Sequence, residues 1–263
     1  MYELEHKKYL KKMRLNKFFI HICQLSIILV FVFLWEYLSN KGIINSFIYS
    51  SPSKALKTIY GLYLDGNLFN HIWVTVYETC ISFMLATFIG TFIAIILWYS
   101  EFLFKVLDPY LTVINSLPKV ALGPIIIIIV GANINSIIIM ALLISLIVTI
   151  SNVYNGFVGT DKNKIKLLKS FKASKWQILR YLVIPSNYLV IVNSLKINVS
   201  MSLIGVIMGE FLVSKQGIGY LINYGSQVFN LNLVFGGIII LLIVSYLMYM
   251  IVVYIEKILI KNN

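Results

Sequence analysis

Long apolar runs separated by polar segments dominate the pattern of the 263 residues. An α-helix of about 20 apolar residues spans a hydrocarbon core of about 30 Å. The runs therefore predict an all-helical integral membrane protein with six transmembrane helices. We expect a basic segment at 1–17 and a single transmembrane domain at 18–263. The spans cover 18–38, 72–98, an interrupted stretch that opens at Asp108-Pro109, 134–154, 188–213 and 233–257.

Two prolines, Pro118 and Pro124, interrupt the third span. A proline leaves a carbonyl of the preceding turn without its helical donor. Within a bilayer such a break is tolerated only where protein or a water-lined cavity covers it. Lys119 follows the first proline. Because a lysine in mid-membrane costs about 2.5–3.5 kcal/mol, we expect its side chain to face the bundle interior or water.

Composition agrees with a membrane protein, since 59% of the residues are hydrophobic, 12% are charged and the mean hydropathy is +0.88. The net charge of +12 would suggest a nucleic-acid partner in a soluble protein. Here, however, 16 of the basic residues fall in the termini and the loops of one side, and 4 fall in the opposite loops. The positive-inside rule then places both termini in the cytoplasm, and we expect no nucleic-acid partner.

The loop at 157–185 is the most distinctive polar segment, and it lies between the fourth and fifth spans. Asp161 can cap a first short helix, and Ser174 with Gln177 forms a capping box that opens a second one. We expect Pro185 to end that second helix. The result is a basic helix–turn–helix with one apolar face. It is suited to binding another protein, although a basic loop that lies on anionic lipid is the simpler alternative.

The fifth span carries two polar sides. Small and polar residues on one side predict close packing against a neighbouring helix, namely Ser194, Asn198, Ser202, Gly205 and Gly209. Another side carries Asn193, Lys196 and Ser200. Together with Lys119 these residues predict an electropositive passage for an anionic solute. The alternative is that the lysines extend towards the headgroups or bond carbonyls freed by the prolines.

Gly217 and Gly219 mark a segment after the fifth span that is too short and too rich in glycine to cross the membrane. Glu210 precedes this segment, near the outer end of the span. We interpret the segment as part of an external gate, and we expect the Glu210 carboxylate to brace it rather than to contact solute.

The sequence carries no pattern of an enzyme. No GxxxxGK[ST] motif is present, so the chain does not hold nucleotide phosphates by that device. Cys23 and Cys80 lie in or beside apolar runs without metal-ligand spacing, and the histidines are scattered. We therefore expect no catalytic residue, metal or cofactor in this chain. If transport is active, ATP and Mg²⁺ belong to a separate ATPase chain.

The motifs resemble the inner-membrane permeases of bacterial ABC importers, in particular the nitrate/sulfonate/taurine branch. The resemblance is carried by Ser51-Pro52-Ser53, Leu117-Pro118 to Pro124, Ala173 to Pro185, and Glu210 to Leu221. The amino-terminal part of the cytoplasmic motif differs from the pattern of that family. Lys166, Leu167 and Leu168 stand where that family has Glu-Ala-Ala, and Lys172 replaces a glycine that normally allows φ > 0.

The resemblance implies a permease subunit in a bacterial cell membrane, with two ATPase subunits, a second permease copy and an extracellular or periplasmic solute-binding protein as partners. It also implies uptake of a small anionic or polar solute of the sulfonate, nitrate, taurine or pyrimidine-precursor type by alternating access. The residues implied in ATPase coupling are Leu167, Leu168, Phe171, Lys172, Ala173, Ser174, Trp176, Gln177 and Pro185.

An ATP-independent secondary transporter or channel is the alternative from another class. Ion coupling of that kind uses charged pairs within the spans. Lys119 and Lys196 stand alone in the sequence, and no carboxylate beside them is evident. The pattern therefore favours the ATP-driven importer.

Overall fold

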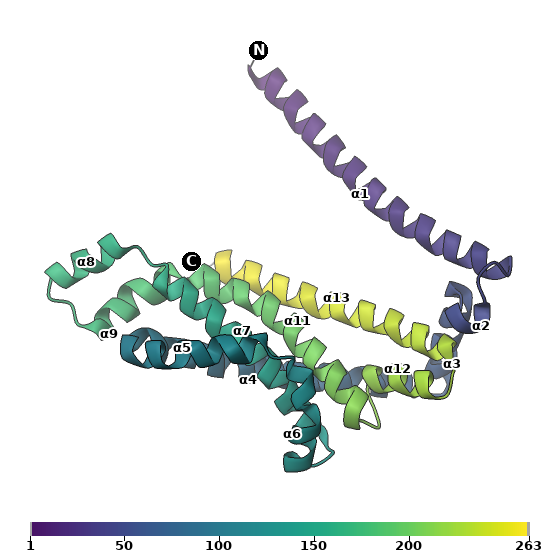
Figure 1. Cartoon of the computed structure of the whole chain (residues 1–263). Helices are drawn as coiled ribbons and strands as arrows, with labels where there is room; N and C mark the ends of the chain where they lie inside the picture. Colours follow the sequence, from purple (N-terminus) through teal and green to yellow (C-terminus); the bar gives the residue numbers. More distant parts are fainter. Residues whose placement is uncertain (1, 262–263) are drawn as a thin grey trace.

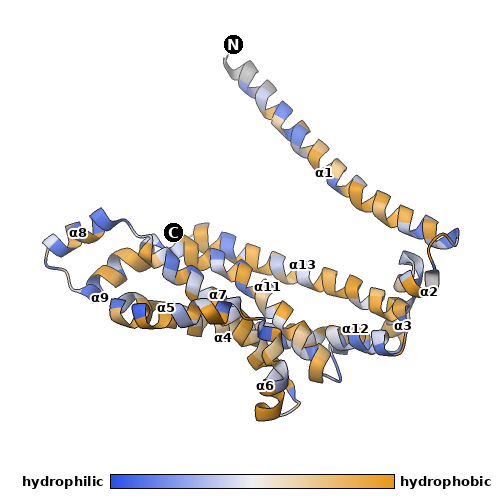
Figure 2. Ribbon diagram, viewed as in Figure 1, coloured by the Kyte–Doolittle hydropathy of each residue, from blue (hydrophilic) through white to orange (hydrophobic). Residues whose placement is uncertain are grey.

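The computed structural model describes residues 2–261, and every regular element in that range is helical. Five helices are long and apolar enough to cross a membrane, or six if a bent pair counts as one span. Figure 2 shows the apolar residues along these helices and hydrophilic residues at α8. The elements are α1 (Tyr2–Asn40), α2 (Ser46–Tyr49), α3 (Pro52–Leu64), α4 (Leu68–Tyr99), α5 (Glu101–Ser116), η1 (Lys119–Leu122), α6 (Gly123–Val130), α7 (Ile134–Val158), α8 (Lys162–Ser170), α9 (Lys175–Ile178), η2 (Leu179–Val183), α10 (Ile184–Ser186), α11 (Tyr188–Val213), α12 (Ile218–Gln227) and α13 (Leu231–Lys261).

The third span begins earlier than the sequence suggested. Ser100 caps α5 by accepting a hydrogen bond from the Leu103 amide, and Pro109 lies inside the helix instead of opening it. The break itself is where the prolines predict it. The helix stops before Pro118, and η1 with α6 continues at a bend of 92°. The interruption thus turns the chain sharply instead of only kinking a straight span.

The centre of the bundle is α7, which packs between α4 and α11. Glycines allow the close approach on both sides, because a Cβ added at Gly90 would lie 2.8 Å from Thr149 and one at Gly205 would overlap the Cα of Ala141. A Cβ at Gly209 would lie 3.0 Å from the Ile137 Cα. Ser194, Asn198 and Ser202 are buried on the same side of α11 as these glycines. We call the contact of Gly205 and Gly209 with α7 the α7–α11 seam.

The remaining helices extend the bundle at its two ends. At one end the Tyr188 hydroxyl donates to the carbonyl of Leu259, which ties the start of α11 to the end of α13. At the other end the Ser50 hydroxyl donates to the side chain of Asn232. Figure 1 shows α8 and α9 beyond the first end and α3 and α12 at the second. The basic loop and the carboxyl-terminal end of α13 therefore share one end of the molecule.

The first helix diverges from the bundle (Figure 1). It is continuous from Tyr2 to Asn40, so the basic segment and the first apolar run form one helix. Its carboxyl-terminal end is held by the Glu36 carboxylate, which accepts hydrogen bonds from the Ser53 amide and hydroxyl, and by the Trp35 ring, 5.1 Å from that of Phe235.

Replacing Gly205 by leucine should disrupt the α7–α11 seam. The new side chain meets the backbone of Ala141, which cannot move aside as a flexible side chain could. We expect the free energy of unfolding to fall by about 1–3 kcal/mol, measured as a lower Tm in detergent and a smaller folded fraction. The matched control is Gly61→Leu on α3, where a Cβ meets nothing within 4 Å. Equal and mild effects of the two variants would contradict the packing role.

Candidate coupling site and translocation face

Two capped helices build the unit between α7 and α11. The Asp161 carboxylate accepts a hydrogen bond from the Asn163 amide at the start of α8. Ser174 and Gln177 form a reciprocal capping box at the start of α9: the Ser174 amide donates to Oε1 of Gln177, and the Gln177 amide donates to Oγ of Ser174. Each cap satisfies backbone amides that the first helical turn leaves free. We call residues 161–186 the coupling unit.

The turn between α8 and α9 is a Schellman motif with a lysine in the left-handed position. Lys172 has φ 60°, its amide donates to the Lys169 carbonyl, and the Ala173 amide donates to the Leu168 carbonyl. Glycine is favoured at this position because a Cβ costs roughly 1–2 kcal/mol there. The chain thus keeps the glycine-type turn although a lysine occupies it.

Pro185 does not end the second helix, contrary to the expectation from sequence. The chain passes through a π-helical stretch at η2 and through α10, which contains Pro185, and it turns at Asn187. The wider π turn has a bond from the Ile184 amide to the Leu179 carbonyl. The helix therefore continues past the proline by local widening.

Asn187 also closes the coupling unit. Its side-chain Nδ2 donates to the Thr160 hydroxyl at 2.7 Å and to the Val183 carbonyl at 2.9 Å, and both Asn187 and Thr160 are buried. Thr160 is the second residue after α7, and Asn187 directly precedes α11. We call this contact the Asn187–Thr160 clip, because it joins the two ends of the unit at the helices from which it extends.

The apolar residues of the coupling unit are divided between two faces. Leu167, Phe171 and Trp176 are 57%, 74% and 54% exposed, respectively. Ile165 and Leu168 instead pack against a core cluster that includes Phe157, Leu179 and Val183. Leu168 and Ala173 therefore lie inward, whereas the sequence analysis grouped them with the outward residues. Lys172, Ser174, Gln177 and Pro185 are exposed.

The two lysines of the expected passage have different partners. Lys119 lies at the break in the third span, and its ammonium donates to Oδ1 of Asn115 at 3.3 Å. Lys196 forms an ion pair with Glu256 of α13 at 2.9 Å, so the interpretation of Lys196 as unpaired was wrong. Asn193 and Ser200 are exposed on α11, and the Ser200 hydroxyl donates to the Lys196 carbonyl.

A polar cleft of about 270 Å³ between α5 and α7 was missed by the sequence analysis. Its lining includes Asp108, Thr112 and Asn115 on α5 and Ser151 and Asn155 on α7. The spacing of three to four residues on each helix is the signal that could have found it. Asn115 also accepts from Lys119, so the cleft adjoins the broken part of the third span.

Glu210 lies at the centre of a buried network near the carboxyl-terminal end of α11. Its carboxylate accepts hydrogen bonds from the Thr75 hydroxyl and the Gly219 amide, and it is 1% exposed. Gly217 has φ 106°, and a Cβ at Gly217 or Gly219 would overlap the carboxylate or approach it within 3 Å. The backbone of α12 therefore approaches Glu210 as only glycine allows. We call Glu210 and its amide partners the outer brace.

Three residues of α4 complete the outer brace, and none of them was found from sequence. His71 accepts a hydrogen bond from the Gly217 amide, and the Thr75 hydroxyl also accepts one from the Ile218 amide. Glu78 is buried, and its Oε2 has no hydrogen-bond partner among the described residues.

Comparison with known proteins places the chain in a family. The model of the family "Binding-protein-dependent transport system inner membrane component" matches residues 86–261. A putative aliphatic sulfonates transport permease protein of Bacillus subtilis (strain 168) is 25% identical over 218 residues, which cover 83% of this chain and 79% of that protein. A riboflavin transport system permease protein of Chloroflexus aurantiacus is 25% identical over 216 residues, 82% of this chain and 81% of that protein.

The fold also has a solved counterpart. A chain in an inward-facing structure of the MetNI methionine ABC transporter superimposes with a TM-score of 0.66 and 18% identity, covering 74% of this chain and 97% of that chain. The likeness shows a shared fold. The family model spans well over half of the sequence, from the middle of α4 to the end of α13. The chain therefore belongs to the family of binding-protein-dependent transport system inner membrane components, and it is the multi-pass membrane permease of an ABC importer and not an enzyme.

Proposed function

We propose that two copies of this permease form the membrane part of an importer that two separate ATPases drive. An external binding protein delivers a small anionic or polar solute, and the passage opens alternately to the two sides. The relatives' names include permeases for aliphatic sulfonates and for riboflavin, which supports small polar solutes as the class. Exposed Asn193 and Ser200, with Lys119 beside the polar cleft, are the residues that we assign to the passage.

The proposed topology has six spans, with α5, η1 and α6 together as the third. Both termini, the segment 1–17 and the coupling unit lie in the cytoplasm. The distribution of 16 against 4 basic residues supports this orientation, as does the position of α8 and α9 near the carboxyl-terminal end of α13 (Figure 1). The outer brace then lies at the external end, where we assign Glu210, Gly217 and Gly219 to the gate.

The coupling unit is where we propose that an ATPase docks. The observation that carries this proposal is the exposure of Leu167, Phe171 and Trp176 on a capped helix pair. Exposed aromatic side chains surrounded by charge are typical anchors of protein interfaces. Lys172, Ser174, Gln177 and Pro185 are exposed on the same unit, whereas Leu168 and Ala173 support it from within.

The coupling unit is also attached in a way that suits transmission of movement. Its ends meet at the Asn187–Thr160 clip, and its inner face packs on Val153 and Phe157 of α7. A displacement of the unit would therefore move α7 and α11 together. These two helices form the seam at the bundle centre. The nucleotide-driven closure of the ATPases would reach the passage along this route.

One observation favours the alternative of an ATP-independent transporter, namely the ion pair of Lys196 with Glu256. Its position argues for a structural role. Glu256 is 8% exposed in the last turns of α13, where the pair links α13 to α11. The pair lies at the end of the bundle where the Tyr188–Leu259 bond also joins these helices. We therefore assign Lys196 to packing between helices and not to the passage.

Truncating the outward anchors should separate the permease from its ATPase. The double variant Phe171→Ala, Trp176→Ala loses two exposed aromatic contacts, each worth about 2 kcal/mol or more at an interface. We expect at least about tenfold weaker co-purification of the ATPase and loss of solute-stimulated ATP hydrolysis. Lys166→Ala, which removes an exposed charge of the same unit, is the control and should change little. Undiminished co-purification and hydrolysis with the double variant would rule out the coupling role.

Substitutions at Lys172 test whether ATPase docking depends on the conformation of the turn or on the charge of the lysine. At φ 60° glycine relieves the Cβ strain, so Lys172→Gly should leave docking intact or tighter and Tm unchanged or higher. Lys172→Val places a β-branched residue in the left-handed region, so it should weaken ATPase docking and lower Tm. Co-purification at two salt concentrations checks this. Weaker docking of the glycine variant, most marked at low salt, would show instead that the lysine charge meets an acidic partner.

The outer brace should depend on Glu210 far more than on Glu78. Glu210→Ala leaves the buried Gly219 amide without its acceptor, at a cost of about 1–3 kcal/mol, and opens a cavity beside two glycines. Glu78→Gln keeps the size of the side chain and removes an acidic group from the buried site, so it should change the free energy of unfolding little. Thermal unfolding and solute uptake are measured for each of the two variants. Similar losses for the two variants would contradict the assignment of the brace to Glu210.

A further inference from the structure

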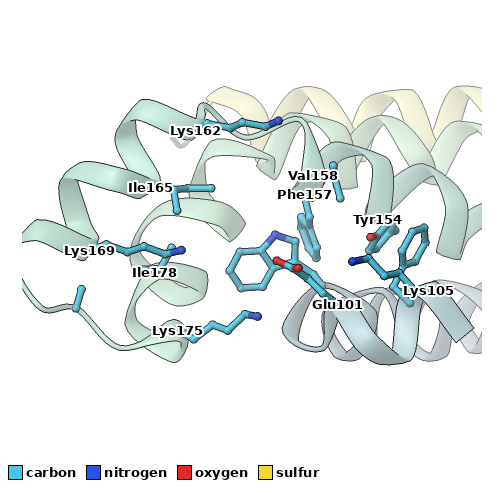
Figure 3. Close-up of a pocket in the computed structure, with 13 residues that line it drawn as sticks. Glu101, Lys105, Tyr154, Phe157, Val158, Lys162, Ile165, Lys169, Lys175 and Ile178 are labelled. Atoms are coloured by element: carbon cyan, nitrogen blue, oxygen red, sulfur yellow. The ribbon is translucent and has the colours of Figure 1, made fainter.

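A cavity of about 410 Å³ lies behind the coupling unit, between α8 and α9 on one side and α4, α5 and α7 on the other. Four lysines from three helices line it: Lys105 on α5, Lys162 and Lys169 on α8, and Lys175 on α9. Figure 3 shows the side chains of Lys169 and Lys175 extending across the cavity towards Glu101, which Lys105 approaches from the other side. The space is much larger than the ~30 Å³ share of one water molecule.

The cavity is strongly basic. Glu101 is the only acidic residue in its lining, against four ammonium groups. Within residues 2–261 none of these lysines forms an ion pair. The Lys175 ammonium lies over the rings of Trp98 and Tyr99, 5.8 and 5.7 Å from their centroids, so its charge is held beside Trp98, which also lines the cavity. The single carboxylate of Glu101 cannot balance four ammonium groups, and a bound anion would offset the excess positive charge.

The inner wall of the cavity is apolar. Phe157 and Ile178 line it and are 0% and 3% exposed. It lies where α4 ends, α5 begins and α7 ends, so in the proposed topology it is level with the cytoplasmic headgroups. Lysines around an apolar wall, with Trp98 and Tyr154 beside them, match the chemistry of an anionic headgroup at a membrane surface.

We propose that this cavity binds a phosphate group, on an anionic phospholipid or as a free phosphate. A phosphate presents several acceptor oxygens, and each ammonium group offers three donors, so one phosphate can be shared by lysines from different helices. Such a ligand would join α8 and α9 to α5 across the cavity. It would thereby hold the coupling unit against the ends of the membrane helices.

The binding of this ligand is independent of ATPase docking. Lys162, Ile165, Lys169 and Lys175 line the cavity, whereas the exposed anchors Leu167, Phe171 and Trp176 are not part of its lining. The two faces of the coupling unit can therefore be occupied at the same time. The site does not rest on the proposed coupling role and can be tested on the permease alone.

The test compares two double variants of the full chain with equal loss of charge. Lys169→Gln with Lys175→Gln alters the cavity, and Lys164→Gln with Lys166→Gln alters exposed lysines of α8 that do not line it. Each protein is purified from vesicles of phosphatidylglycerol and phosphatidylcholine, and native mass spectrometry counts the retained lipids. We expect the cavity variant to retain at least tenfold less phosphatidylglycerol than the unaltered chain, and the control variant to match the unaltered chain.

A second arm distinguishes a lipid from a free anion. In lipid-depleted detergent, inorganic phosphate and pyrophosphate are titrated while tryptophan fluorescence is followed, with Trp98→Phe as the reference that removes the signal of the cavity. A saturable response that the cavity variant loses assigns the site to a free phosphate; loss of phosphatidylglycerol alone assigns it to a lipid. Ala173→Leu, which fills the cavity without changing charge, should abolish whichever signal is seen. Equal lipid retention by both double variants, with no response to either anion, would overturn the proposal.

Discussion

The close contact between α7 and α11 is the interaction on which the rest of the structure depends. Helices in a bilayer gain little from burying apolar surface against each other, so they associate through close packing and internal hydrogen bonds. Gly205 and Gly209 bring the two backbones together, and Gly90 does the same between α4 and α7. The coupling unit and the outer brace are both attached to these three helices. The coupling unit leaves α7 and returns to α11, and the outer brace joins α4 to the end of α11.

The proposed coupling role depends on the two faces of the coupling unit. Its inner face, with Ile165, Leu168 and Ile178, anchors it to the membrane helices, and the Asn187–Thr160 clip fixes its ends. Its outer face leaves Phe171 and Trp176 free for a partner. A loosely attached loop would bind an ATPase without transmitting its movement. The strained Lys172 turn is tolerated because the Schellman bonds and two caps hold the surrounding backbone.

Helix caps and helix breaks were predictable from the sequence because the residues that form them are close together in the chain. The caps at Asp161 and Ser174, and the break at Pro118, depend on residues within a few positions of each other. The family resemblance likewise rested on local motifs, and the family match confirms it. Pro185 was misjudged because a proline forbids one hydrogen bond but not a wider π turn around it.

Contacts between distant segments could not be predicted in the same way. Glu256 lies 60 residues from Lys196, and Thr75 lies 135 residues from Glu210, so nothing in the neighbouring sequence indicates these pairs. The polar cleft appears only when α5 is placed against α7. The division of the coupling unit into two faces also depends on the core beneath it, since Leu167 and Leu168 are adjacent in sequence and differ only in what packs against them.

The most direct test of the central claim, that the outer face of the coupling unit meets the ATPase, is site-specific photo-crosslinking in native membranes. A photoreactive phenylalanine analogue is introduced at position 171 on the outer face, or at position 165 on the inner face of the same helix pair. We predict a crosslink to the ATPase from position 171 and none from position 165, where Ile165 packs against the protein's own core. A crosslink from position 165 but not from 171, or from neither, would contradict the account.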